Sequence, residues 1–330
     1  MTAPHHRAEG GFCNPWPGDR ARGLADFLRW RRERRAAPRR SDGAPLKVSA
    51  SAFTAPRAAP GELTATWVGH STVLLQLGPV NILTDPMWSR RASPVWWVGP
   101  ARRVKAAVPL RALPPVDLVL LSHDHYDHLD RRTVRRLRRR HPEAMWYAPL
   151  GVEAHLRRWG VRQAQALDWG DAAVAKGATV ACVPARHFSG RSLRDRGRTL
   201  WAGWVISAGP WRVYFAGDTA YHPDFACLAT RHGPFDLALL PIGAYAPRWL
   251  METVHMDPDE VVRAYTDLAS AHPGAPPSLL PIHWGVFSLS DEPMSEPPTR
   301  VRAGWAAAGL PQDNLWMLNP GETRRLERGG

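Results

Sequence analysis

The sequence predicts an α/β fold whose strands lead directly into polar site residues. Residues 116–121 form a short apolar run that is typical of a buried strand. The next nine residues, 122–130, contain three histidines and three aspartates, and the arginine-rich stretch 131–140 has helical character. Farther along the chain, predicted strands and helices alternate. The histidine cluster therefore lies on a loop at the carboxyl end of a strand, where open α/β sheets place their binding sites.

The first 60 residues differ in composition from the rest, because they are rich in arginine, proline and alanine. We expect a basic N-terminal arm over residues 1–60, partly docked through 12–17, and a main domain over 61–330. Residues 24–35 combine five arginines with apolar side chains, which are Leu24, Phe27, Leu28 and Trp30. This stretch is interpreted either as a basic helix lying on an anionic membrane or as a partly disordered arm.

A β-meander is predicted next, because three short strand-like runs are separated by turn residues. The runs are 63–68, 72–77 and 80–84. Asp85 follows the third run and is either a turn residue before Pro86 or a partner that orients a metal-binding histidine. Residues 69–73 do not form the G-x-S-x-G turn of serine hydrolases, because Val73 stands where the last glycine is needed.

The histidine cluster has the residue types and spacing of a metal site. His123 and His125 alternate along an extended backbone, so both point the same way. Asp127 and His128 follow where the chain turns into the helix, and they serve a second point nearby. Neutral imidazoles and carboxylates suit zinc, with iron and manganese as alternatives.

Three later predicted strands also lead into possible metal ligands, namely His187, Asp218 and His283. Two metal ions need about seven ligands when one carboxylate bridges them and a water lies between them. The complete candidate set is His123, His125, Asp127, His128, His187, Asp218 and His283. The sequence therefore predicts a two-metal centre, with two Zn²⁺ as the leading assignment.

Length and composition narrow the function classes. No run approaches the roughly eighteen apolar residues of a membrane-spanning helix, and no apolar segment follows the first residues as in a secretory signal. The three cysteines are widely spaced, which indicates a reducing compartment and no thiolate metal site. The net charge of +13 favours anionic partners, although arginine enrichment by composition explains it equally well. The seven arginines of 131–140 likewise form either a solvated helix face or an anion-binding face.

With these motifs, the sequence resembles the metallo-β-lactamase fold superfamily, and within it the N-acyl-phosphatidylethanolamine-hydrolysing phospholipase D family and its bacterial relatives. The H-x-H-x-D-H pattern at 123–128 carries the superfamily resemblance. Tryptophan-rich blocks are more specific to the phospholipase branch, and they include 14–17 (NPWP), 66–70 (TWVGH), 200–204 (LWAGW), 247–249 (PRW) and 282–285 (IHWG). The similarity covers nearly all of residues 12–323.

The resemblance implies a metallo-β-lactamase αββα sandwich over 61–330, with two mixed β-sheets flanked by helices. By the same resemblance, one zinc takes His123, His125 and His187, the other takes Asp127, His128 and His283, and Asp218 bridges them. His255 matches a family histidine near the substrate phosphate. Val254 stands where the mammalian enzyme has a glutamine, so a polar contact to the substrate is lost. The family also implies a homodimer with an apolar groove for acyl chains.

The expected activity is that of a zinc-dependent phosphodiesterase of the phospholipase D type. It would cleave an N-acyl-phosphatidylethanolamine-like phospholipid to phosphatidic acid and N-acylethanolamine, with hydroxide between the metals as nucleophile. The expected catalytic residues are Asp127, Asp218 and His255. Alternatives are a nuclease, a lactonase or phosphorylated-sugar hydrolase of the same fold, and a non-catalytic membrane-associated metal protein. Nucleic acid is not favoured, because no basic module with aromatic stacking platforms is evident. The expected location is cytoplasmic, with peripheral contact at the inner face of an anionic membrane.

Overall fold

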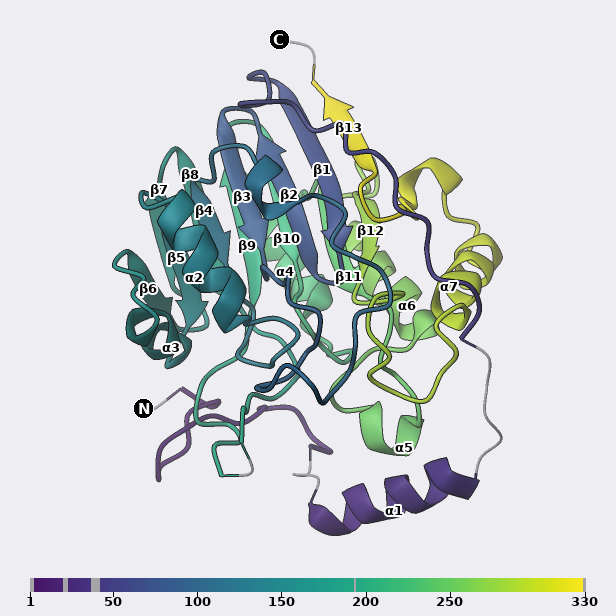
Figure 1. Cartoon of the computed structure of the whole chain (residues 1–330). Coiled ribbons are helices and arrows are strands. Elements are labelled where there is room, and N and C mark those ends of the chain that lie inside the picture. The colour runs from purple at the N-terminus through teal and green to yellow at the C-terminus, as the bar shows by residue number, and fades with distance from the viewer. Residues whose placement is uncertain (1–2, 20–22, 37–41, 193, 329–330) are drawn as a thin grey trace.

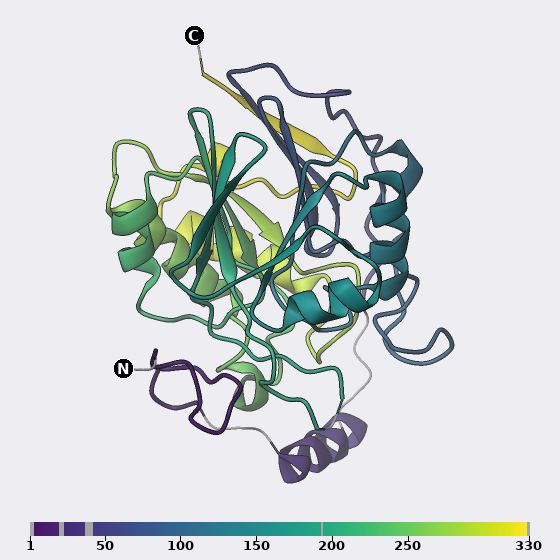
Figure 2. The same cartoon turned by 90° about the vertical axis from the view of Figure 1, so that its left-hand side faces the viewer.

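The computed structural model describes residues 3–19, 23–36, 42–192 and 194–328, with all their side chains except those of Leu24 and Phe27. Two mixed β-sheets pack face to face, and helices cover the outer face of each (Figure 1). From the side, the sheets lie between green helices on the left and teal helices on the right (Figure 2). The predicted αββα sandwich is therefore confirmed.

The first sheet has seven strands in the order β13-β1-β2-β3-β4-β5-β6. Its strands are β1 (Glu62–Gly69), β2 (Thr72–Leu77), β3 (Val80–Thr84), β4 (Leu118–Leu120), β5 (Met145–Pro149), β6 (Ala164–Leu167) and β13 (Thr323–Glu327). The predicted meander is confirmed, because β1, β2 and β3 pair antiparallel in sequence order. From β3 to β6 the pairing is parallel.

The second sheet has six strands in the order β12-β11-β10-β9-β8-β7. Its strands are β7 (Ala172–Ala175), β8 (Ala178–Val183), β9 (Gly203–Ala208), β10 (Trp211–Phe215), β11 (Leu237–Pro241) and β12 (Ser278–Ile282). Pairing is antiparallel from β7 to β10 and parallel from β10 to β12. Strands β8, β10, β11 and β12 therefore share one direction.

Helices bury the outer faces of both sheets. They are α2 (Arg131–Arg140), α3 (Val152–Arg158), α4 (Phe225–His232), α6 (Pro258–Ser270) and α7 (Glu296–Ala307). The short helix α5 (Arg248–Met251) has no buried residue and lies below the sheets in Figure 1, and 3₁₀ turns occur at Leu110–Ala112 and Gln312–Asn314. Leu137 of α2 packs in one core cluster with Trp146 of β5, which confirms the predicted helix over 131–140. Tyr265 of α6 packs on Trp305 of α7 with ring centroids 4.3 Å apart. Among the described residues, no helix has both the length and the apolar character needed to cross a bilayer.

Strand β1 alternates in sequence but has no solvent-exposed face. Thr64 is fully buried, and its hydroxyl donates to Gln76 Oε1 at 3.0 Å. The backbone N–H of Thr54 donates to the same oxygen at 2.9 Å. The segment that precedes β1 therefore covers the outer face of the meander, while the opposite face packs against the second sheet.

The carboxyl ends of strands from both sheets meet at one edge, from which the long loops leave at the bottom of Figure 1. In the first sheet these ends belong to β1, β3 and β4, which run in the same direction. In the second sheet they belong to β8, β10 and β12. Every candidate ligand follows one of these strands, so the fold brings distant parts of the sequence to one place.

The N-terminal segment contacts the body close to that edge. Asn14 donates to the carbonyl of His187 at 2.8 Å and accepts from the indole N–H of Trp201 at 3.1 Å. His5 and His6 each place Nε2 2.7 Å from a carboxylate oxygen of Asp168. Contacts of the N-terminal residues are therefore not confined to 12–17.

The basic stretch 24–35 is helical in the structure, where it forms most of helix α1 (Leu24–Ala36). This helix also contacts the body. The indole N–H of Trp30 donates to Asp291 at 2.6 Å, and that of Trp249 donates to Glu33 at 3.0 Å. Residues 20–22 and 37–41, which carry further arginines of the expected arm, lie outside the described residues. The division of the chain at residue 60 stays a prediction.

Candidate metal centre

Three histidines from two strand ends form the first group of the site. His123 and His125 lie on the loop after β4, and His187 follows β8. The Nε2 of His123 lies 2.8 Å from the Nδ1 of His125, and the Nε2 of His187 lies 3.2 Å from that same atom. These nitrogens are close enough to bind one ion together.

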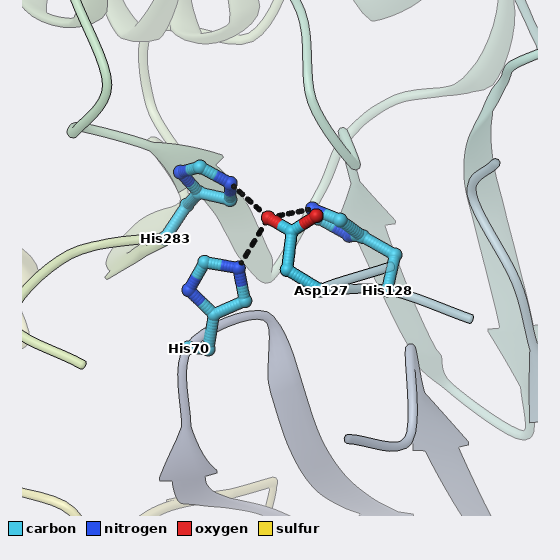
Figure 3. A group of neighbouring side chains, drawn as sticks. All are labelled: His70, Asp127, His128 and His283. Atoms are coloured by element: carbon cyan, nitrogen blue, oxygen red, sulfur yellow. Dashed lines mark hydrogen bonds and ion pairs between the residues drawn. The ribbon is translucent and has the colours of Figure 1, made fainter. Parts of the chain in front are cut away.

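A second group surrounds Asp127 (Figure 3). Its Oδ2 lies 3.3 Å from the Nε2 of His128 and 3.3 Å from the Nε2 of His283. The Nε2 of His70 approaches the same oxygen at 3.0 Å. Figure 3 shows all three imidazoles pointing at this carboxylate. The second group therefore contains a histidine outside the ligand set predicted from the sequence.

Asp218 lies between the two groups. Its Oδ2 is 3.0 Å from the Nε2 of His128 and 3.1 Å from that of His283. The same oxygen is 3.9 Å from the Nε2 of His123 and 3.8 Å from that of His187. One buried carboxylate oxygen thus faces imidazoles of both groups, which is the position of a bridging ligand.

The backbone at the strand ends adopts unusual conformations that aim these side chains. His70 and His283 have positive φ angles of 58° and 60°, and the N–H of His283 donates to the carbonyl of His70 at 3.2 Å. Gly217, which precedes Asp218, has a φ of 63°, and a Cβ there would lie 2.5 Å from the Cβ of Ser122. Such conformations are rare outside glycine and persist where the surrounding structure holds them.

Buried hydrogen bonds orient the imidazoles from behind. The Nδ1 of His128 lies 2.7 Å from Asp85 Oδ2, and the hydroxyl and N–H of Ser122 donate to the same carboxylate at 2.6 and 2.7 Å. Asp85 was predicted either as a turn residue or as a partner that orients a histidine. The structure shows the second role, because Asp85 contacts His128. The Nδ1 of His187 donates to the carbonyl of Val254 at 2.7 Å. These contacts turn the Nε2 atoms toward the centre, as ligands require.

The other two aspartates of the loop shape the backbone. Asp124 accepts from the N–H of Gly190 at 2.8 Å and from the hydroxyl of Thr199 at 2.9 Å. Asp130 caps α2 by accepting from the N–H of Arg132 at 3.1 Å. Only Asp127 of the three aspartates belongs to the group of potential ligands.

Burial keeps most imidazoles of the centre neutral. It lowers the pKa of His125 to about 4, and those of His70 and His187 to about 3. Burial also lowers the pKa of His123 and of His255 well below the usual value. A neutral imidazole is the form that binds a metal ion.

Carboxylates have the opposite effect on two histidines. Burial disfavours their charged forms, but Asp218 and Asp127 outweigh it and raise the pKa of His283 to about 9 and that of His128 well above its usual value. Burial likewise opposes ionisation of the two aspartates, yet the imidazoles hold both their pKa values well below the usual range. The carboxylates therefore require nearby positive charge, which either protons or metal cations can supply.

Several buried polar atoms of the centre have no hydrogen-bond partner among the described residues. They include the Oδ1 of Asp218, and also the Nε2 atoms of His128 and His283, which approach carboxylate oxygens within ion-pair distance but without the geometry of a hydrogen bond. Buried polar atoms without partners are costly, and bound ions are one way to satisfy them. A donor set of imidazole nitrogens and carboxylate oxygens suits zinc, iron or manganese. The residues present therefore fit a pair of metal ions.

The structure brings all the predicted site residues into this one region. The His255 ring lies 4.9 Å from that of His187 and 5.2 Å from that of His283, measured between centroids. Which residue binds which metal stays a prediction. His70 was not predicted, although it stands at the carboxyl end of β1, the kind of position that identified the other candidate ligands.

A match to the β-lactamase superfamily domain covers residues 80–284, which is more than half of the chain. Over 243 residues the chain is 49% identical to an uncharacterised protein of Mycobacterium tuberculosis, spanning 73% of this chain and 63% of that protein. Over 237 residues it is 38% identical to a Caenorhabditis elegans protein named N-acyl-phosphatidylethanolamine-hydrolyzing phospholipase D 1, spanning 69% of this chain and 65% of that protein. The matched region thus spans less than two thirds of the length of these relatives.

Solved structures share the sandwich. A metallo-hydrolase of the archaeon Ignicoccus hospitalis superposes with a TM-score of 0.60 over 81% of this chain and 100% of its own, at 24% identity. An isothiocyanate hydrolase from Delia radicum gut bacteria gives a TM-score of 0.61 over 80% of this chain and 99% of its own, at 21% identity. At these identities the likeness concerns the fold alone.

Proposed function

The chain belongs to the β-lactamase superfamily, and on that basis we propose that it is a metal-dependent phosphodiesterase of the phospholipase D type. The position of Asp218 Oδ2 between two groups of imidazoles carries the proposal, because it suits a carboxylate shared by two metals. The proposed substrate is an N-acyl-phosphatidylethanolamine-like phospholipid. The products would be phosphatidic acid and an N-acylethanolamine.

In this proposal, one metal would be held by His123, His125 and His187, and the other by Asp127, His128 and His283. Asp218 would be shared by the two. When bound, the metals would supply water activated near neutral pH and positive charge opposite the phosphoryl oxygens. Two Zn²⁺ are the leading assignment, with iron or manganese as alternatives.

Other side chains would position the reactants. His255 is buried and neutral, and we assign it a hydrogen bond to a phosphate oxygen of the substrate. Asp127 is ionised, and it would take the proton released by the attacking water and pass it to the departing alcohol. His70, 3.0 Å from Asp127, would hold that carboxylate in place, as Asp85 holds His128.

The lipid substrate is favoured by the C. elegans relative, whose name states that activity. A nuclease is the second candidate, because the net charge of +13 suits a polyanion. Lactonase or phosphorylated-sugar hydrolase activity would use the same centre. We also propose that the protein binds peripherally to an anionic membrane at its cytoplasmic face, and that it forms a homodimer.

The test compares substrates on zinc-loaded protein. Detergent-dispersed N-acyl-phosphatidylethanolamine and single-stranded RNA are each incubated with the enzyme, and products are identified by mass spectrometry. The Asp218→Ala variant serves as the control for contaminating activity. Release of N-acylethanolamine by the wild type alone supports the proposal. Cleavage of RNA with no lipid turnover favours the nuclease. If the protein cleaves neither the lipid nor the RNA, the phosphodiesterase assignment is overturned for both substrates.

A further inference from the structure

A cavity of about 520 Å³ lies beside the metal loop, and arginine is the most frequent residue in its lining. We call it the arginine pocket, and its cationic residues are Arg90, Arg91, Arg131, Arg132, Arg135, Arg158 and Arg191. They come from the loop after β3, from α2, from the end of α3 and from the loop after β8. We propose that the arginine pocket binds a phosphate group, supplied by an anionic phospholipid head group or by a small phosphorylated molecule.

Little negative charge balances these arginines. Within the ranges that the structure describes, none of the seven has a carboxylate within 4 Å in an ion pair. Asp130 is the one acidic residue in the lining, and its oxygens already accept from the N–H of Ser89 at 3.0 Å and the hydroxyl of Thr133 at 2.5 Å. The pocket therefore presents a large excess of positive charge to a ligand.

Arg191 forms a fixed part of the wall. Its Nη1 donates to the carbonyl of Leu129 at 3.0 Å, and its guanidinium carbon lies 3.9 Å from the ring centroid of Tyr126 and 5.5 Å from that of Trp159. Burial lowers the pKa of Arg191, but a guanidinium stays protonated in proteins. A positive charge is thus held in a partly dehydrated position, where an anion interacts with it more strongly.

Phosphate is the anion that suits such a lining best. A guanidinium donates two parallel hydrogen bonds to a phosphate, and several guanidiniums can surround its oxygens at once. The volume lies within the roughly 300–1,000 Å³ of pockets that hold small molecules. Apolar residues in the lining, among them Trp96, Leu129 and Trp159, also leave room for a non-polar part of the ligand.

The rim of the pocket favours a lipid as the source of the phosphate. Trp96 lines the pocket and is 68% exposed, and the neighbouring Trp97 is 62% exposed. Exposed indoles of this kind lie at the boundary between head groups and acyl chains in membranes. The segment between β3 and β4 that carries them projects from the body at the lower right of Figure 2.

The pocket also adjoins the metal loop. Tyr126 stands between His125 and Asp127 in the sequence, lines the pocket, and donates its hydroxyl to the carbonyl of Arg191 at 3.0 Å. A phosphate bound here would hold the protein on a lipid surface beside the metal centre. The proposal is independent of the phosphodiesterase assignment, because binding requires no bond cleavage.

Vesicle co-sedimentation of the full-length, zinc-loaded protein tests the proposal. Vesicles of phosphatidylcholine alone are compared with vesicles that also contain phosphatidylglycerol. The pocket variant is Arg132→Glu with Arg135→Glu. The matched control is Arg136→Glu with Arg139→Glu, which changes the charge of the same helix equally at exposed positions outside the lining.

We expect the pocket variant to bind phosphatidylglycerol vesicles at least roughly 25-fold more weakly, at about fivefold for each positive charge lost, and the control to lose much less. Equal losses in both variants would overturn the proposal, because they would report only net charge. Absence of wild-type binding both to these vesicles and to inorganic phosphate would overturn it as well. Circular dichroism spectra that match the wild type in both variants are the control for loss of the fold.

Two further measurements separate the sources of the phosphate. Trp96→Ala with Trp97→Ala should weaken vesicle binding and leave calorimetric binding of inorganic phosphate unchanged if the ligand is a lipid. If the pocket variant loses inorganic phosphate while vesicle binding is the same in all variants, the ligand is a small phosphorylated molecule. If wild-type phosphate binding survives the pocket substitutions, phosphate binds elsewhere and the assignment of this pocket is wrong.

Discussion

Replacing Asp218 by asparagine keeps the volume of the side chain and removes its charge. In the wild type, one oxygen of this carboxylate faces four imidazole nitrogens at 3.0 to 3.9 Å. Removing one partner of a buried ion pair destabilises a protein by about 3–5 kcal/mol, because the charge that remains is no longer compensated. A loss of this size in metal-binding free energy would weaken the affinity for the metal by roughly a hundredfold to several thousandfold. We therefore expect Asp218→Asn to lose at least one metal and nearly all activity.

The matched comparison is His255→Ala, which removes a buried imidazole of the same region that is assigned to the substrate. Its loss should lower activity by roughly 10- to 100-fold while both metals are retained. Metal content and lipid hydrolysis are measured on both variants under saturating zinc. If Asp218→Asn keeps both metals and more activity than His255→Ala, the assignment of Asp218 as the bridging ligand is wrong.

Three further outcomes follow from the same geometry. His70→Ala should lower activity by roughly 10- to 100-fold through loss of its contact to Asp127, and wild-type activity in this variant would remove His70 from the site. Gly217→Ala should lower the free energy of unfolding by about 1–3 kcal/mol more than Gly170→Ala. Both glycines have positive φ, but only at Gly217 does a side chain lie 2.5 Å from the added Cβ. Equal losses of the two variants in denaturant titrations would contradict this. The pKa of His283 in the folded protein is raised to about 9, above its ordinary value. In the metal-free protein, its contribution to stability is therefore complete below about pH 6.5 and is lost as the pH rises to about 9. Denaturation midpoints that rise between pH 6.5 and 9 would refute the raised pKa of His283.

The sequence was sufficient to predict which residues gather at this edge, because the candidate ligands stand in recognisable local patterns. The H-x-H-x-D-H loop follows an apolar strand, and Asp218 and His283 end two others. His70 was not predicted, because it follows a strand end but has no second potential ligand beside it in the sequence, unlike the histidines of 123–128. Its place becomes visible only when β1 is known to run in the same direction as β3 and β4, so that all three end at one edge.

Long-range packing explains the other differences. Thr64 reads as the polar member of an alternating strand, yet it is buried because a preceding segment covers it. Trp30 was expected on a basic arm, and its partner Asp291 lies 261 positions away in the sequence. The arginines of α2 were predicted either to be solvated or to bind anions. Three of them line a pocket together with arginines of other elements, such as Arg191, which no pattern within 131–140 could indicate.

The number of metal ions per chain tests the central claim most directly. Protein purified without chelator and supplemented with zinc is dialysed and measured by elemental analysis against its amino-acid content. Two groups of nitrogen and oxygen donors that share Asp218 predict close to two ions per chain, and fewer in Asp218→Asn. One ion or none in the wild type would contradict the two-metal centre.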